Sequence, residues 1–255
     1  MNLKIAILDT GYESYTYEKK LFPNHGFELC IYDGPARDRE QKYQFAGDAV
    51  GILVRELRID ERALEYMPRL KAIVRYGVGY DNIDLDACRK RNIRVANVQG
   101  YANHSVSDHA LALMFSCARG VEGSKKAAFS RPSRQDIFEL HDKTIGIIGI
   151  GRIGSQFALK VKPLFKRVLA YDPYKTKEYI ESTGAKKVEL NFVLEHSHVI
   201  SLHCNLTEET RHILDEGAFD RMRGKPVIIN TSRGPVIRES ALLQALNSGL
   251  VHSAG

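Results

Sequence analysis

No apolar run in this 255-residue sequence approaches the roughly 20 residues that a membrane-spanning helix needs. The first residues are a short basic lead into an apolar stretch, which is not the pattern of a secretory signal peptide. Cysteine is scarce, and the four cysteines are Cys30, Cys88, Cys117 and Cys204. Because no two of them form a C-x-x-C pair, the sequence favours neither a disulfide framework nor a zinc site. We therefore expect no membrane partner, no metal and a cytoplasmic location.

A continuous basic stripe is also missing, although the formal net charge is +6. The positive residues come in short scattered runs such as Lys19-Lys20 and Lys186-Lys187. None of these runs alternates with aromatic residues, as the binding surfaces for single-stranded nucleic acids do. We therefore expect a solvated basic surface and no nucleic-acid partner. The composition, 44% hydrophobic and 27% charged, is typical of one large or two medium globular domains.

The first hundred residues alternate short apolar runs with helical patterns. The runs predict strands at residues 3–9, 27–32, 49–54, 71–76 and 93–98. Asp60 and Asp84 are placed to cap helices over residues 61–66 and 85–91. Strands that alternate with helices at this pace predict a parallel, doubly wound α/β sheet.

The rest of the chain continues this alternation. Apolar residues at three- and four-residue spacing predict a long amphipathic helix over residues 105–117. Gly120 to Pro132 then predicts a surface connection between two lobes. Further strands are expected at residues 144–148, 167–172, 199–203 and 227–231, with helices over residues 155–165 and 238–247. One more strand begins at Val251, and we expect the second lobe to be incomplete at this last strand.

The strand at residues 144–148 leads directly into Gly149-x-Gly151-x-x-Gly154. In this setting Gly149 makes the tight turn, Gly151 lets a pyrophosphate approach the backbone, and Gly154 lets helix pack on strand. Alone, the triplet is a weak signal, and a purely structural glycine turn is the alternative. A second strand ends in Asp172, 18 residues after Gly154, at the spacing of the carboxylate that binds the ribose of NAD. Together these features predict a dinucleotide site.

Three further loops follow predicted strands, where ligands bind in open α/β sheets, and one of them is Ser201-Leu-His203-Cys-Asn205-Leu-Thr207. The backbone N–H groups of Gly77 and Gly79 suit a carboxylate, although a plain tight turn explains these glycines equally well. The planar guanidinium of Arg233 suits a substrate carboxylate. A surface ion pair is the alternative for this arginine, and the following Gly234-Pro235 argues against it.

From Val54 to Gly255 the sequence resembles the family of D-isomer-specific 2-hydroxyacid dehydrogenases. The motifs are Gly77-x-Gly79-x-Asp81-Asn82-Ile83-Asp84, Val106-x-Asp108-His-Ala-Leu-Ala, Gly149-x-Gly151-Arg-Ile-Gly154, Ser201-Leu-His203, Glu209-Thr-Arg-His-Ile and Asn230-Thr-x-Arg233-Gly. The family includes phosphoglycerate and lactate-type dehydrogenases and the C-terminal-binding-protein corepressors. The Asp108-His109 pair and the residues after Ser201 look more like the corepressor-related branch.

The resemblance implies a flavodoxin-like substrate-binding lobe at residues 1–100 and a Rossmann-type NAD lobe at residues 101–255. It also implies hydride transfer between NADH and a 2-oxo acid or D-2-hydroxy acid, with Arg233 as the catalytic residue and a homodimer as the assembly. The implied cofactor contacts are Val78, Gly149, Gly151, Arg152, Ile153, Gly154, Asp172, Cys204, Asn205, Thr231 and Ser232. The implied substrate contacts are Arg55, Val78 and Gly79. Asp172 favours NAD over NADP, because a 2′-phosphate would meet a carboxylate.

The sequence departs from the family pattern in its polar residues. Asp108 stands where the family usually has Glu, and Asn205 stands in the region of a family proline. Glu56 replaces a frequent serine and would repel an acidic substrate tail, which disfavours 3-phosphoglycerate.

The resemblance places the family's general-acid histidine and its glutamate partner after the sixth strand, beyond Gly255. Both are needed because the oxo group takes up a proton as hydride arrives. We expect neither His109 nor His203 to replace that histidine. Two alternatives remain open at this point: a non-catalytic, NAD(H)-sensing scaffold like the corepressors, and a truncated pseudo-enzyme.

Overall fold

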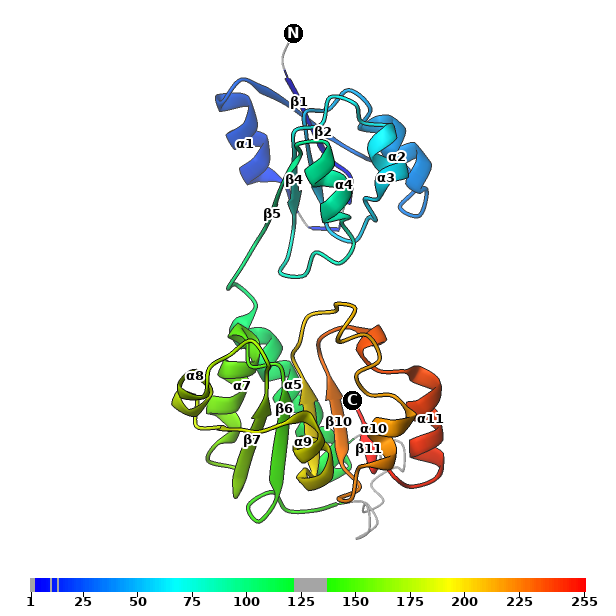
Figure 1. The fold of residues 1–255 in the computed structure, drawn as a ribbon. Coiled ribbons are helices and arrows are strands. Elements are labelled where there is room, and N and C mark those ends of the chain that lie inside the picture. Colours follow the sequence, from blue (N-terminus) through cyan, green and yellow to red (C-terminus); the bar gives the residue numbers. More distant parts are fainter. Residues whose placement is uncertain (1–2, 10, 13, 122–136) are drawn as a thin grey trace. The chain divides into compact units, whose positions relative to one another are not determined.

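The computed structural model describes residues 3–9, 11–12, 14–121 and 137–255. The chain forms two compact units, Met1–Gly100 and Tyr101–Gly255, and each is built on its own parallel β-sheet (Figure 1). The predicted α/β class is therefore confirmed. Among the described helices, none has the length and apolar character that crossing a membrane requires.

The first unit holds a five-stranded sheet in the order β2-β1-β3-β4-β5, which is the flavodoxin-like order. Its strands are β1 Leu3–Ile7, β2 Phe27–Ile31, β3 Gly51–Val54, β4 Ala72–Arg75 and β5 Arg94–Asn97. Its helices are α1 Thr16–Asn24, α2 Arg39–Phe45, α3 Glu61–Glu65 and α4 Leu85–Lys90. All five predicted strands are present, and each lies inside its predicted range.

Alternate residues along the strands of the first unit pack on opposite faces of the sheet, as the two-residue period of a strand requires. On β1, Ala6 joins the core that lies against α2, α3 and α4, whereas Ile5 and Ile7 pack on the face that carries Phe22 of α1. The sheet is therefore covered on both sides, which leaves the strand ends as the places for ligand loops.

Two predicted helix caps in the first unit are confirmed. The side chains of Asp60 and Asp84 accept the backbone N–H groups of Ala63 and Ala87, so each carboxylate satisfies a free donor at a helix start. Helices α1 and α2 are additions to the predicted elements.

The second unit holds a six-stranded sheet in the order β11-β10-β9-β6-β7-β8, which is the Rossmann order with two mononucleotide-binding halves. Its strands are β6 Thr144–Ile148, β7 Arg167–Tyr171, β8 Lys186–Lys187, β9 Val199–Leu202, β10 Val227–Asn230 and β11 Ser253–Ala254. Its helices are α5 Asn103–Arg119, α7 Arg152–Val161, α8 Lys177–Ser182, α9 Leu190–His196, α10 Glu216–Asp220 and α11 Glu239–Asn247, with a short 3₁₀ helix at Gly234–Val236.

The structure of this unit differs from the prediction in three places. Helix α7 begins at Arg152, three residues earlier than predicted, and ends at Val161 because Pro163 follows. The strand β8 was not predicted, because two lysines carry no apolar pattern. Residues 122–132 of the predicted connection lie outside the described residues, and α5 packs on α7 within one unit. The predicted connection therefore does not join the two units.

Candidate functional site

The loop between β6 and α7 contains three glycines, and a side chain added at each would meet different surroundings. Gly149 has a φ of +89°, and a Cβ there would lie 2.5 Å from the backbone nitrogen of Cys204. A Cβ on Gly154 would overlap the carbonyl oxygen of Gly149. By contrast, a Cβ on Gly151 would meet nothing within 4 Å. Gly149 and Gly154 are thus needed for packing, whereas Gly151 leaves one side of the loop open to a ligand.

The open side of the loop coincides with the start of α7. Gly151 occupies the N-cap position and has no side chain to satisfy the first backbone N–H groups of the helix. Free N–H groups and the helix dipole attract negative charge at this end. Arg152 is exposed at the first helical position, so it adds a full positive charge there. The arrangement suits a phosphate group.

Asp172 directly follows β7 and is 8% exposed. Its Oδ2 atom accepts the N–H of Ile150 in the glycine loop, and its Oδ1 atom accepts the N–H of Tyr174, both at 2.9 Å. The carboxylate therefore holds the glycine loop against the end of β7. Each oxygen keeps a lone pair for another donor, because a carboxylate oxygen can accept more than one hydrogen bond.

A cavity of about 330 Å³ lies beside this loop. Its walls come from the glycine loop, from residues 171–175 at the end of β7, and from residues between His203 and Ile213 after β9. Its volume falls in the range of ligand sites, which begins at about 300 Å³. Two larger hollows, of about 640 and 650 Å³, lie near Leu3 and near Gly255, and no residue of the glycine loop lines either of them. The smaller cavity is the candidate because glycine loop and carboxylate converge on it.

His203 and Cys204 line the cavity with uncharged side chains. Burial lowers the pKa of His203 to about 4, so its imidazole is neutral near physiological pH. The ring lies 4.8 Å from that of Phe157 between centroids, and its Nε2 atom is 2.9 Å from Ser201 Oγ. Burial also raises the pKa of the Cys204 thiol to about 11. These two side chains therefore bring no charge to the cavity.

Arg233 lies in a loop after β10 that is held by the side chain of Asn230. The Nδ2 atom of Asn230 donates to the carbonyl of Arg233 at 2.9 Å, while its Oδ1 atom accepts the N–H of Ser232 at 3.0 Å. Arg233 Nη1 donates to the carbonyl of Ser232 at 2.9 Å. Thr231 Oγ1 is buried and has no hydrogen-bond partner among the described residues. Asn230 belongs to a motif identified in the sequence, but its role in holding the loop was not predicted, although an Asn two residues before a turn N–H is a recognisable Asx turn.

The first unit carries the other predicted contacts. Gly77 has a φ of +140°, and a Cβ there would overlap the guanidinium of Arg75. Val78 is fixed by its carbonyl, which accepts Asn97 Nδ2 at 2.6 Å. Arg55 follows β3, and its Nη2 atom lies 3.2 Å from a carboxylate oxygen of Glu56. Glu56 therefore pairs with the arginine beside it.

The predicted residues thus fall into three groups. Gly149, Gly151, Asp172, Cys204 and Asn205 line one cavity of the second unit. Thr231, Ser232 and Arg233 form a separate loop of the same unit, and Arg55, Val78 and Gly79 belong to the first unit. Of the remaining motif residues, Asp108 accepts Lys160 Nζ at 2.6 Å and links α5 to α7.

Residues 109–255 match the sequence pattern described as "D-isomer specific 2-hydroxyacid dehydrogenase, NAD binding domain". Among curated proteins, the glyoxylate reductase of Korarchaeum cryptofilum is 37% identical over 205 residues, which cover 77% of this chain and 61% of that protein. The D-lactate dehydrogenase of Escherichia coli is 32% identical over 99% of this chain and 78% of its own length.

Solved structures agree with these relatives. The D-lactate dehydrogenase of Aquifex aeolicus, in complex with NAD and lactic acid, superposes with a TM-score of 0.86 at 29% identity, covering 99% of this chain and 75% of that one. The chain spans between about half and two thirds of the length of several curated relatives that it matches. The resemblance seen in the sequence is therefore confirmed: the chain belongs to the D-isomer-specific 2-hydroxyacid dehydrogenase family, and its second unit contains the NAD-binding domain of that family.

Proposed function

We propose that the protein transfers a hydride between NADH and a 2-oxo acid, or in reverse from a D-2-hydroxy acid to NAD. The observation that carries this proposal is the glycine loop held by Asp172 beside an open cavity, in the same unit as Arg233. Relatives named for glyoxylate and for lactate support a small 2-oxo acid as the substrate.

The cofactor contacts are proposed from the geometry of the second unit. Gly151 leaves the loop open beside Arg152 and Ile153, which suits the pyrophosphate. Asp172 keeps lone pairs for the adenosine ribose, and Cys204 with Asn205 forms the opposite wall. Thr231 Oγ1 and Ser232, next to the catalytic arginine, suit the nicotinamide end, since the buried hydroxyl still needs a partner. When bound, NADH supplies the hydride.

The substrate contacts are proposed from charge and backbone donors. Arg233 presents a permanent positive charge with several N–H groups, so it binds the carboxylate and oxo oxygen and stabilises the negative charge that develops on that oxygen. The backbone N–H groups of Val78 and Gly79 offer further donors to the carboxylate, and Arg55 offers a second cation.

Neither His203 nor Cys204, which line the cavity beside the glycine loop, is assigned as the proton donor. A general acid needs a pKa near the working pH. The pKa of His203 is about 4, and that of Cys204 is about 11, so the first carries no proton to give and the second holds its proton too tightly. His109 is exposed on α5.

The test is a mixture of the native full-length protein, NADH and a panel of 2-oxo acids from glyoxylate and pyruvate to branched and aromatic members. We expect NADH absorbance to fall with at least one small member. Tight NADH binding without turnover on any member would reject the proposal and favour the NAD(H)-sensing scaffold.

We also propose a cytoplasmic homodimer. The assembly follows from the family resemblance, and the exposed apolar side chains Phe115 of α5 and Leu159 of α7 are surfaces that a second copy would cover. Light scattering on the purified protein tests this, and a monomer at micromolar concentration would contradict it.

A further inference from the structure

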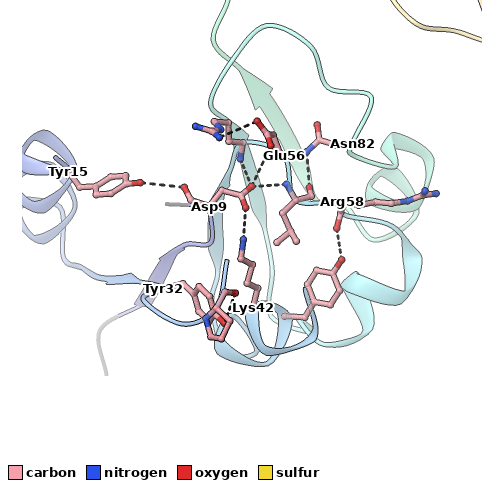
Figure 2. Close-up of polar contacts among 11 residues, drawn as sticks. Asp9, Tyr15, Tyr32, Lys42, Glu56, Arg58 and Asn82 are labelled. Atoms are coloured by element: carbon pink, nitrogen blue, oxygen red, sulfur yellow. Dashed lines mark hydrogen bonds and ion pairs between the residues drawn. The ribbon is translucent and has the colours of Figure 1, made fainter. Parts of the chain in front are cut away.

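The carboxylate of Asp9, just after β1, accepts four hydrogen bonds from distant parts of the first unit (Figure 2). Its Oδ2 atom accepts the backbone N–H groups of Arg55 and Glu56 at 2.8 Å and of Leu57 at 2.7 Å. Its Oδ1 atom accepts Lys42 Nζ of α2 at 2.8 Å. Successive N–H groups that converge on one point form an anion-binding nest. Here the nest is filled by a carboxylate of the same chain.

This carboxylate is buried and charged. Asp9 is 8% exposed and Lys42 is 5% exposed, and such a pair is tolerated only with good geometry and satisfied donors. Burial by itself raises the pKa of Asp9. The bonds from Lys42 and from the three N–H groups outweigh burial, so the pKa lies below its usual value. Asp9 is therefore ionised at neutral pH, and its two oxygens already accept four hydrogen bonds.

The anchored loop determines where Arg55 points. The Nε–H of Arg55 is buried and has no acceptor among the described residues, and its contact with Glu56 is an exposed pair that contributes little. The backbone is held more firmly: the carbonyl of Arg55 accepts Arg75 Nε at 3.0 Å, and the carbonyl of Leu57 accepts Asn82 Nδ2 at 2.8 Å. The direction of the Arg55 side chain therefore depends on the path of its backbone.

We infer that Asp9, paired with Lys42, is a positioning residue that fixes the loop Val54–Leu57 and so holds Arg55 in place for the substrate. The inference rests on the proposed function, because the position of Arg55 matters only to a protein that binds a 2-oxo acid. Asp9 lies 46 residues before Arg55 and acts through the loop, since its oxygens accept hydrogen bonds from the loop and from Lys42.

Two variants separate anchoring from simple loss of stability. Asp9→Asn leaves Lys42 buried without a carboxylate, which is strongly destabilising. Asp9→Asn/Lys42→Met removes both charges, so it weakens the nest without leaving an unpaired lysine. The matched control is Asp48→Asn, because Asp48 pairs with Lys4 Nζ at the same 2.8 Å in the same unit, with a side chain that is 66% exposed.

We expect both Asp9 variants to accelerate hydrogen exchange at the amides of residues 55–57 by about tenfold, the effect of one weakened hydrogen bond. We expect kcat/KM for the 2-oxo acid to fall by up to about tenfold, which is no more than the loss of the Arg55 side chain itself would cost, mainly through a higher KM. The Kd of NADH stays unchanged, since the glycine loop belongs to the other unit. Asp48→Asn leaves the exchange, the KM and the Kd unchanged.

Unchanged exchange at these amides in the double variant would overturn the inference, and so would faster exchange with an unchanged KM. A wild-type protein that turns over no 2-oxo acid contradicts the proposed function. In that protein, faster exchange in the double variant would still support Asp9 as the anchor of the loop, whereas unchanged exchange would remove the anchor as well.

Discussion

Both units use an aspartate at the end of one strand to hold the loop after a neighbouring strand. In the second unit, Asp172 after β7 accepts an N–H from the glycine loop after β6. In the first unit, Asp9 after β1 accepts the N–H groups of the Arg55 loop after β3. The strands β6 and β7 pair directly, and so do β1 and β3.

The two carboxylates differ in the acceptor capacity that remains. Each oxygen of Asp172 accepts one N–H, and the residue lines a cavity. One oxygen of Asp9 accepts three N–H groups and the other accepts an ammonium. A carboxylate offers about four acceptor sites in total. Asp9 already accepts four hydrogen bonds, whereas Asp172 accepts two. Under the proposed function, Asp172 combines anchoring with ligand contact, whereas Asp9 acts on the ligand only through Arg55.

The two arginines should show the largest difference between the units. We expect Arg233→Ala to lower kcat/KM by about 100- to 1,000-fold, the usual cost of removing a donor to a developing oxyanion. Arg55→Ala should cost about tenfold, the effect of one ground-state ionic hydrogen bond. Steady-state kinetics measure both effects. Arg238→Ala is the control, because Arg238 forms an exposed pair with Glu216 at 3.2 Å. Equal losses of kcat/KM for Arg55→Ala and Arg233→Ala would contradict the different roles proposed for the two arginines.

The glycine loop allows a second comparison, between Gly151, which leaves room for a ligand, and Gly149, which the packing of the protein requires. Gly151→Ala adds a Cβ that touches nothing within 4 Å, so Tm should be unchanged. NADH binding should nevertheless weaken by about 1–3 kcal/mol, the usual cost of steric crowding, if a pyrophosphate lies there. Gly149→Ala should lower Tm as well, because its Cβ would press on backbone. Calorimetry and fluorescence titration measure the two quantities, and unchanged NADH affinity in Gly151→Ala would place the pyrophosphate elsewhere.

Asp172→Asn tests whether this anchor also touches the ligand. The amide keeps one acceptor oxygen and loses the charge, so we expect NADH to bind about tenfold more weakly, as for loss of an ionic hydrogen bond. The preference for NADH over NADPH should shrink, because the 2′-phosphate no longer meets a carboxylate. Asp9→Asn should change neither affinity. Titration of NADH and NADPH into both variants measures these affinities. The same affinities in Asp172→Asn and Asp9→Asn would mean that the two carboxylates do not differ in their contact with the ligand.

Acid should weaken the first unit through Asp9. The pKa of this carboxyl in the folded chain lies below its ordinary value of 3.8. Its stabilising effect is therefore complete above that ordinary value and is lost as the pH falls through the folded pKa. Urea unfolding from neutral to acid pH should show a smaller acid loss in Asp9→Asn/Lys42→Met than in wild type. Parallel curves for the two proteins would argue against a depressed pKa.

Local sequence signals were sufficient for most of the fold. The strands, the caps Asp60 and Asp84 and the turn at Gly149 each depend on residues a few positions apart, so a sequence pattern can reveal them. The start of α7 was misplaced because Gly151 supplies no capping side chain to mark it. The roles of the individual site residues remain predictions, since the positions of side chains relative to a ligand do not follow from spacing.

Contacts across the sheet could not be predicted in the same way. A lysine is rarely buried, and nothing next to Lys42 in the sequence indicates that it pairs with Asp9, 33 residues earlier. The bond from Ile150 to Asp172 spans 22 residues and was likewise hidden, although the acid itself was identified. The strand β8 is held by pairing with β7 rather than by any apolar pattern. Each of these features depends on which strands become neighbours.

The link from Asp9 to the Arg55 loop ties the order of that loop to the docking of β1. Proteins open locally at free energies well below that of complete unfolding. An opening that detaches β1 from β3 would pull the carboxylate out of its nest and free the loop, with the glycine loop untouched in the other unit. Mild heat or denaturant should therefore produce molecules that still bind NADH but no longer bind the 2-oxo acid. Activity would then be lost at a lower temperature or denaturant concentration than nucleotide binding.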